Sequence, residues 1–493
     1  GGVMRLYYYY LFAVLLGYST ALLAESPSLN TKRSEFTKAL HLGTLDINSS
    51  TKDLEAKKHI ELGMKLLHAF MYEPAQVEFV SAQTINRHAA MAYYGELMSQ
   101  KHMLWQYENL SKAHAIIKKS KYWLDESQIL PIEKALLHSA YRLFEPKKSS
   151  HYRLSQAILS LSDDKKKLNY DVELELALLL LKLGYVSEFP NDRHNVELLA
   201  KSRVEIDALF RQNPAHPGAI HYHLHYFDSD DQAIAIKAKP SAIAASTLLY
   251  SSSHLAHMSA HIYRRLRLWK AFVVANQLSI NASDNLCAHS VVLMGENRRK
   301  KLLKCDAENR YHALEWLHFG ALKLEDNTLG QAALARMLRD AKQLGCDDFY
   351  AWFYRMWARQ FLLYPRFYTP IIKVRPITQK NQNTYWMAYS ECGALLANGL
   401  LKIHQKLPIT KDLLRLKRVA TKASQLTDPF VFNTCKLNNA LLLAYQFKQS
   451  NTHKVKNSFL VKAFDFEKKL ISTEATPSLN FIDVNTFKLK FLF

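Results

Sequence analysis

Apolar residues recur at intervals of three and four residues over most of this chain, which is the spacing of amphipathic α-helices. The clearest example covers residues 56–87, where two helical stretches are joined by a short turn. Small residues in each stretch let the two helices approach closely, and aromatic residues fill the groove between them. The packing positions of this predicted pair are Gly63, Tyr72, Ala75, Phe79 and Ala82.

Two further stretches repeat this arrangement. In residues 254–282, Trp269 corresponds to Tyr72 of the first pair, and Arg267 stands in the turn, where glycine is usual. A third pair begins at Tyr311. The packing positions of these two pairs are Trp269, Trp316, Gly320 and Ala332. We therefore predict an all-α protein of antiparallel helix pairs stacked as a right-handed α-solenoid, with strand content near zero.

The pattern divides the chain into four segments. Residues 1–24 predict a secretory signal peptide, with a positive start, an apolar run and small-residue exits near Ala21 and Ala24. An uncleaved membrane anchor is the alternative. Residues 25–55 are polar and predict a tether, and residues 56–345 predict an N-terminal repeat array. Residues 346–493 predict a C-terminal helical region of truncated repeats, because the chain stops about where another repeat would begin.

The charge balance is strongly basic. Lys and Arg number 65 against 44 Asp and Glu, and the formal net charge is +21. A basic surface attracts acidic proteins and anionic lipid headgroups, so we expect an acidic protein or peptide partner or association with a membrane surface. A solvated surface with no such role is the alternative. No motif of a nucleic-acid-binding module occurs, so we expect no specific nucleic-acid partner.

The cysteines are scattered and do not predict a disulfide-bonded framework. The chain has five cysteines without a C-x-x-C motif, and their odd number leaves at least one free thiol. Disulfides are therefore optional for this fold. The leader pattern of residues 1–24 predicts a periplasmic or secreted protein.

Two histidine pairs stand out as candidate chemistry. His221 and His225 lie four residues apart, as do His257 and His261, so each pair shares one face of a helix. His254 extends the second pair along the same face. Imidazole is the commonest metal ligand, and two such helices facing each other would supply four nitrogens to zinc or copper. A packed seam between helices is the alternative interpretation.

Asp228 follows the first pair closely. It is a possible addition to the site as an acceptor behind a metal-bound histidine, or it caps a helix that begins near Asp231. Neither histidine pair contains the glutamate of an HExxH metalloprotease motif. The sequence therefore offers ligands without a hydrolytic base.

These segments also carry a family resemblance. The stretches HPGAIHYHLHYFD at residues 216–228 and HLAHMSAHIYRRLRLW at residues 254–269 resemble two signature stretches of a little-characterised family of bacterial tetratricopeptide-repeat (TPR) proteins. That family typically has glycine where Arg267 stands and proline where Ser259 stands. The resemblance implies a TPR-like repeat scaffold and brings no established activity with it.

Catalytic motifs are absent from the sequence: there is no nucleophile elbow, phosphate-binding loop or dinucleotide fingerprint. We therefore expect an exported, non-enzymatic TPR-type scaffold that binds protein or peptide, without a cofactor. The competing hypothesis is a metal-binding protein or metal-dependent enzyme that uses zinc or copper at the histidine cluster. Elemental analysis of untagged protein separates the two.

Overall fold

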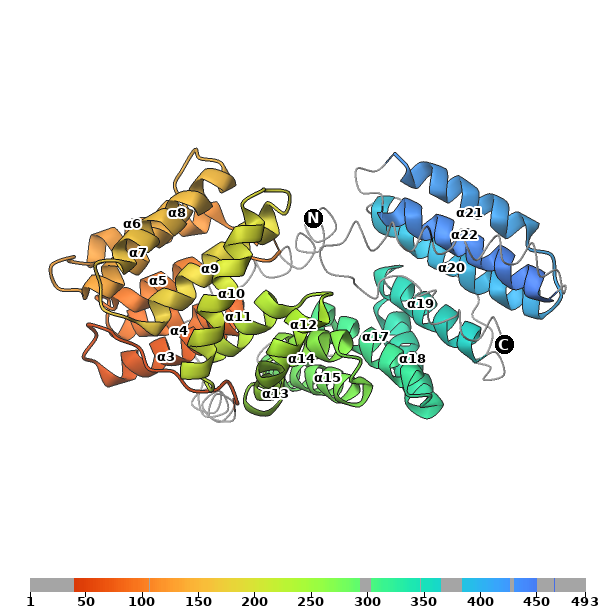
Figure 1. Ribbon diagram of the computed structural model, residues 1–493, viewed down its shortest axis with the longest axis horizontal. Helices are drawn as coiled ribbons and strands as arrows, with labels where there is room; N and C mark the ends of the chain where they lie inside the picture. Colours follow the sequence, from red (N-terminus) through yellow and green to blue (C-terminus); the bar gives the residue numbers. More distant parts are fainter. Residues whose placement is uncertain are drawn as a thin grey trace. The chain divides into compact units, whose positions relative to one another are not determined.

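The computed structural model of the chain describes residues 40–105, 107–292, 303–345, 347–364, 384–425, 430–449 and 465. Within these residues nearly every element is a helix (Figure 1), so the prediction of an all-α protein is confirmed for them. The exception is a two-stranded antiparallel ribbon, in which Lys101 pairs with Glu108 and His102 with Tyr107. Its strands are β1 (Lys101–His102) and β2 (Tyr107–Glu108).

The chain divides into two compact units after Ala282, within one helix. The helices of the first unit are α3 (Leu54–His68), α4 (Tyr72–Ile85), α5 (Ala90–Met98), α6 (Leu110–Trp123), α7 (Pro131–Leu143), α8 (Ser150–Lys165), α9 (Val172–Glu188), α10 (Asn195–Gln212), α11 (Pro217–Phe227), α12 (Gln232–Ala235), the 3-10 turn η1 (Ile236–Ala238), α13 (Lys239–Leu248), α14 (Ser253–Arg265) and the first part of α15 (Trp269–Val292). The second unit holds the end of α15 with α17 (Ala307–Lys323), α18 (Asn327–Leu344), α19 (Asp347–Leu363), α20 (Thr384–His404), α21 (Thr410–Ala423) and α22 (Phe430–Gln449).

One turn recurs between successive helices. After α3, Phe70 adopts a left-handed conformation with φ 56°, and the next N–H, of Met71, donates to the carbonyl of Leu66 at 2.9 Å. This is the Schellman arrangement, which satisfies the last carbonyls of a helix. The same φ sign and the same hydrogen bonds recur at three other helix ends, centred on Arg267, Glu325 and Lys406. The described helices are therefore joined in a repeat-like manner.

The first helix pair packs as its small residues require. A Cβ added at Gly63 on α3 would lie 2.7 Å from the ring of Phe79 on α4, so only glycine admits that ring. Phe79 itself is fully buried. The other predicted positions of this pair, Tyr72, Ala75 and Ala82, are buried as well.

The later pairs differ in detail. Trp316 and Gly320 are buried in α17, while Trp269 at the start of α15 is only partly covered. Ala332 is exposed, so it does not pack as predicted. Helical geometry explains the difference, because a neighbouring residue is rotated by about 100°. Ala333, one position further, is buried in its place.

Two predicted boundaries are placed differently. The part of the expected tether from residue 40 onward lies against the first unit: Leu42 and Ile47 are buried, and the Thr44 N–H donates to the carbonyl of Ala215 at 3.0 Å. The compact units divide at residue 282 rather than 345, since α18 and α19 pack on each other. The predicted leader and the residues after 465 lie outside the described residues.

Two disulfides lie in the second unit. They join Cys287 to Cys305 and Cys392 to Cys435, with Cα atoms 5.7 and 5.3 Å apart. Within the described part of the chain, no helix combines the length and the apolar character needed to cross a bilayer.

Candidate metal centre

Helices α11 and α14 carry the histidines and pack against each other. The start of α11 is set by Pro217, whose missing N–H costs nothing in a first helical turn, and by His216, whose Nδ1 accepts the Gly218 N–H at 3.2 Å. The start of α14 is capped by Ser252, whose hydroxyl accepts the Leu255 N–H at 3.2 Å. The register of both helices is thereby fixed by local capping.

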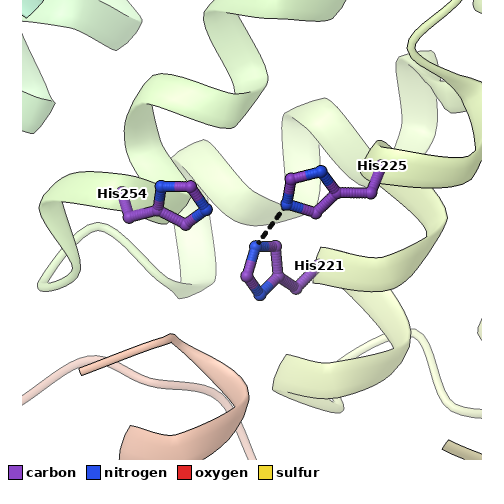
Figure 2. A group of neighbouring side chains, drawn as sticks. All are labelled: His221, His225 and His254. Carbon is purple, nitrogen blue, oxygen red and sulfur yellow. Dashed lines mark hydrogen bonds between the residues drawn. The ribbon is translucent and has the colours of Figure 1, made fainter. Parts of the chain in front are cut away.

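Three histidines from these two helices converge (Figure 2). The Nε2 atoms of His221 and His225 are 3.0 Å apart, and the ring of His254 lies 5.0 Å from that of His221 between centroids. One nitrogen from each of the three lies within 4.8 Å of the others. The sequence had grouped His254 with the second pair, but the structure places it with the first.

The His221 imidazole has a defined tautomer. Its Nδ1 lies 2.5 Å from the carbonyl oxygen of His68. A carbonyl can only accept, so Nδ1 carries the proton and Nε2 presents a lone pair toward His225. A backbone acceptor behind a histidine is the arrangement that orients metal-binding imidazoles.

Two aromatic rings cover the cluster. The Phe70 ring lies 4.3 Å from the His221 ring and 5.5 Å from the His254 ring, and it stacks on the latter. Trp105 meets His254 edge-on at 5.3 Å. Phe70 occupies the left-handed turn after α3, so the repeat-like turn itself delivers an apolar cover to the histidines.

Burial keeps the imidazoles of His221 and His225 neutral. Burial lowers the pKa of His221 well below its ordinary value of 6.5, and the charge of His225 lowers it further. Burial also lowers the pKa of His225, and His254 adds to that effect. Neutral imidazole is the form that binds metals, so no proton has to be removed from these two at pH 7.

The second pair, His257 and His261, forms a separate group. Its two Nε2 atoms are 3.2 Å apart. His257 Nδ1 lies 2.9 Å from the Asn276 side-chain oxygen, and His261 Nδ1 lies 2.9 Å from an Asp228 oxygen. Among the described residues, the nitrogens of the two pairs do not gather at one point, so they do not form the four-histidine set that we predicted.

Asp228 therefore serves the second pair, although it follows the first in sequence. Burial raises the pKa of Asp228, but the nearby His261 and Arg265 outweigh burial and hold that pKa well below its usual range. Arg265 Nε donates to the same carboxylate at 2.7 Å. The cap of α12 is Asp231, whose side chain accepts the Ala233 N–H.

A buried cluster that the sequence did not reveal lies behind the first site. Glu173 accepts hydrogen bonds from Nε2 of His68 and of His216, each at 2.9 Å. The Tyr222 hydroxyl lies 2.9 Å from the other nitrogen of His68. Burial raises the pKa of Glu173, but the two histidines together bring it far below its ordinary value, so the carboxylate is ionised.

Sequence analysis could not have found this cluster, because Glu173 stands in a leucine-rich run and lies 105 residues from His68. Gly218 leaves room for the His68 ring, since a Cβ at this position would lie 2.5 Å from it. His223 belongs to neither cluster: it is buried and bonded to Ser241 and Asp207.

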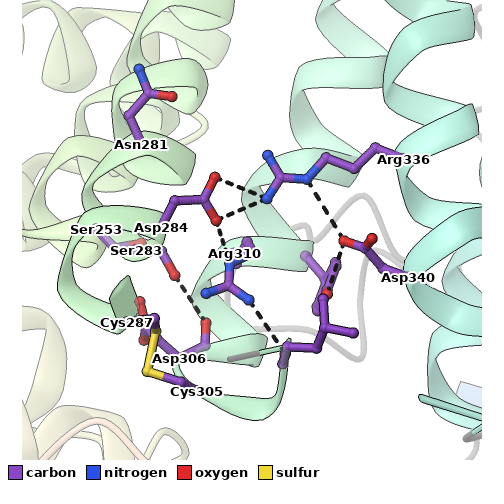
Figure 3. Close-up of polar contacts among 12 residues, drawn as sticks. Ser253, Asn281, Ser283, Asp284, Cys287, Cys305, Asp306, Arg310, Arg336 and Asp340 are labelled. Carbon is purple, nitrogen blue, oxygen red and sulfur yellow. Dashed lines mark hydrogen bonds and ion pairs between the residues drawn. A yellow bond between two sulfur atoms is a disulfide. The ribbon is translucent and has the colours of Figure 1, made fainter. Parts of the chain in front are cut away.

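The second unit has a charged network of a different kind (Figure 3). Arg310 and Arg336 both bind Asp284, with nitrogen–oxygen distances of 2.9 and 2.8 Å. Arg336 also approaches Asp340, which accepts the Tyr311 hydroxyl at 3.0 Å. Both carboxylates are held by arginines or tyrosine, so this network ties α15, α17 and α18 together and offers no metal ligands.

Comparison with known proteins identifies no relative: no family model, curated protein or solved structure matches this chain. The resemblance to TPR proteins therefore stays a prediction.

Proposed function

We propose that this protein binds a transition metal ion, zinc or copper, at His221, His225 and His254. One observation carries the proposal: three imidazole nitrogens from two helices lie within 4.8 Å of one another. Two nitrogens bound to one tetrahedral zinc ion are separated by roughly 3.3 Å, and the His221–His225 separation of 3.0 Å is close to that value. Three protein ligands leave one coordination position for water or a further ligand.

The chemistry of the donors narrows the choice of metal. Imidazole suits zinc and copper, whereas magnesium and calcium prefer oxygen ligands. The aromatic cover over the site lowers the local polarity, which favours retention of an ion once it is bound. The His68 carbonyl behind His221 orients one ligand before the ion arrives.

The test is zinc binding by untagged protein, measured by calorimetry and elemental analysis. We expect His254→Gln to weaken the binding of one zinc ion by at least 10-fold. The matched control is His223→Gln, which removes a buried histidine of α11 that faces away from the cluster and should leave zinc binding unchanged. Unaltered zinc affinity in His254→Gln would overturn the proposal.

A second candidate function is a TPR-like scaffold, stacked as a right-handed α-solenoid, for an acidic protein partner. The recurring turns after α3, α14, α17 and α20 support the repeat architecture. The basic face of α21 supports the kind of partner, because Lys411, Arg418 and Lys422 are exposed and lie at helical spacing.

A salt series tests this second function. An acidic partner recovered by pull-down should dissociate as ionic strength rises, because exposed charges are screened beyond about 8 Å at physiological salt. Reversing the three charges of α21 to glutamate should abolish capture. Reversing three scattered exposed lysines, Lys52, Lys118 and Lys270, alters the net charge equally and should leave capture intact.

We also propose that the protein is exported to the periplasm or secreted. The leader-like residues 1–24 and the two disulfides support this, since disulfides persist in oxidising compartments. N-terminal sequencing of envelope material should find a mature chain that starts near Leu22 or Glu25. An intact leader on cytosolic protein would contradict export.

A further inference from the structure

We infer that His257 and His261 form a second transition-metal site, separate from the three-histidine site. Both lie on α14, and their Nε2 atoms face each other at 3.2 Å. That separation is close to the roughly 3.3 Å between two nitrogens bound to one tetrahedral zinc ion. The pair therefore spans one ion with little movement of either side chain.

The outer nitrogen of each imidazole is held by an acceptor. Asn276 directs its Nδ2 to the carbonyl of Phe272 at 2.9 Å, so its side-chain oxygen faces His257. On the other side, the Asp228 carboxylate faces Nδ1 of His261 and can only accept while it is ionised. Both Nδ1 atoms thus donate outward, and both Nε2 lone pairs point toward the same space.

Hydrogen-bond acceptors on the outer nitrogens are typical of metal-bound histidines. An amide or carboxylate acceptor on the far nitrogen fixes the ring and raises its basicity as a ligand. The Asp228 carboxylate, which Arg265 also binds at 2.7 Å, places negative charge beside the pair. Both imidazoles of the pair are thereby oriented before any ion arrives.

Solvent access sets the expected coordination. The His261 side chain is 15% exposed, whereas the Asp228 carboxylate behind it is 4% exposed. An ion can therefore enter from the His261 side and complete its coordination with water. Two imidazoles and water suit zinc or copper(II) and do not suit magnesium or calcium.

The second site does not rest on the first. All four residues that build it, His257, His261, Asp228 and Asn276, lie outside the trio of His221, His225 and His254. Removing either set of ligands should therefore leave the other set of ligands in place. This independence makes the two sites separable by experiment.

The test is a zinc titration, followed by calorimetry, of the full-length protein and of variants that lack ligands of one site or of both. We expect two zinc equivalents in the wild type and one in His225→Gln/His254→Gln. The remaining equivalent should disappear when His261→Gln is added. The control His223→Gln should keep both equivalents, and circular dichroism verifies that each variant is folded.

The outcomes separate the two sites. If the wild type binds one equivalent that His261→Gln leaves unchanged, the second site is wrong and the three-histidine site stands. If the wild type binds one equivalent that is lost in His261→Gln and kept in His225→Gln/His254→Gln, the site at His257 and His261 stands and the three-histidine site is wrong. Anomalous diffraction at the zinc edge from wild-type crystals needs no variant. A zinc ion between the Nε2 atoms of His257 and His261 supports the inference, and zinc found only at other positions overturns it.

Discussion

The carbonyl oxygen of His68 accepts a hydrogen bond from Nδ1 of His221, although the two residues are 153 positions apart in sequence. His68 ends α3, and its side chain is bound by Glu173 and Tyr222. One residue thus connects a buried charged cluster, through its side chain, to a candidate metal ligand, through its backbone. The position of His221 therefore depends on what holds His68.

Glu173→Gln tests this dependence. His68 and His216 donate to different oxygens of Glu173, and glutamine replaces one of these oxygens with an NH₂ group, so a buried donor loses its acceptor. We expect the free energy of unfolding to fall by about 1–3 kcal/mol, the cost of leaving a buried hydrogen-bonding group without its acceptor. Urea unfolding measures this loss. The control is Glu197→Gln, which alters an exposed glutamate paired with Lys201 and should cost less than about 0.5 kcal/mol.

Zinc binding by the same variant tests the connection to the metal site. We expect Glu173→Gln to weaken zinc binding at the three-histidine site by about 10-fold, since residues behind a ligand typically affect affinity by 10- to 100-fold. Unchanged affinity in a folded, destabilised variant would limit Glu173 to a role in stability.

Gly218→Ala probes the close contact between α11 and α3. The added Cβ would lie 2.5 Å from Nδ1 of His68 and 2.9 Å from a methyl group of Leu176, both in the buried core. We expect a loss of about 1–3 kcal/mol, which is typical of overpacking. The loss should appear as a lower urea midpoint with an unchanged slope.

The control for that experiment is Gly330→Ala on α18. Its nearest neighbour would be 3.4 Å away, which is an ordinary contact. Alanine stabilises a helix interior by about 0.5–1 kcal/mol relative to glycine. Opposite signs for the two substitutions would establish that the effect at Gly218 is steric, and equal signs would contradict it.

These contacts show which features of the fold local sequence patterns can encode. The helix pair at residues 56–87 was predictable because helical periodicity and the small residue at Gly63 are local signals. The pairing of His254 with α11 was not, because it depends on Phe70 and the packing of helices far apart in sequence. Spacing along one helix reveals which side chains share a face, but not which other helix meets that face.

Glu173 illustrates the same limit for charged residues. A glutamate beside a leucine-rich run looks like the solvated edge of a helix. In the fold it is 4% exposed, because two histidines from α3 and from the cap of α11 offset the cost of its burial. Such compensation requires three segments to meet, and no local pattern encodes it.

Stability should depend on pH through His223. Burial lowers its pKa from 6.5 to about 4, and Asp207 opposes this only in part. Between pH 4 and pH 6.5 the unfolded chain therefore binds more protons than the folded protein. The stability that neutral, buried His223 contributes is complete above pH 6.5 and is lost as pH falls toward 4. A shift of this size corresponds to on the order of 3 kcal/mol.

The difference between the wild type and His223→Gln isolates this effect. Urea unfolding at pH 7.5, 6.0 and 5.0 should give a steeper loss of stability with acid in the wild type than in the variant. The variant itself should be less stable at pH 7.5, because the buried hydrogen bonds from His223 to Ser241 and Asp207 are lost. Parallel pH profiles would show that other groups carry the acid sensitivity.

Arg267→Gly tests the recurring turn directly. Arg267 has φ 56°, a left-handed conformation that costs a non-glycine residue roughly 1–2 kcal/mol. Glycine adopts this conformation without that cost but loses more chain entropy on folding, so we expect a net gain of up to about 1 kcal/mol. Thermal unfolding followed by circular dichroism gives the sign of the change in stability.

The contrasting variant is Lys118→Gly, at an exposed position inside α6, where glycine should destabilise by about 1 kcal/mol. A gain at residue 267 with a loss at residue 118 would show that the left-handed conformation of this turn favours glycine. A loss at both would mean that the arginine side chain stabilises the turn in some other way.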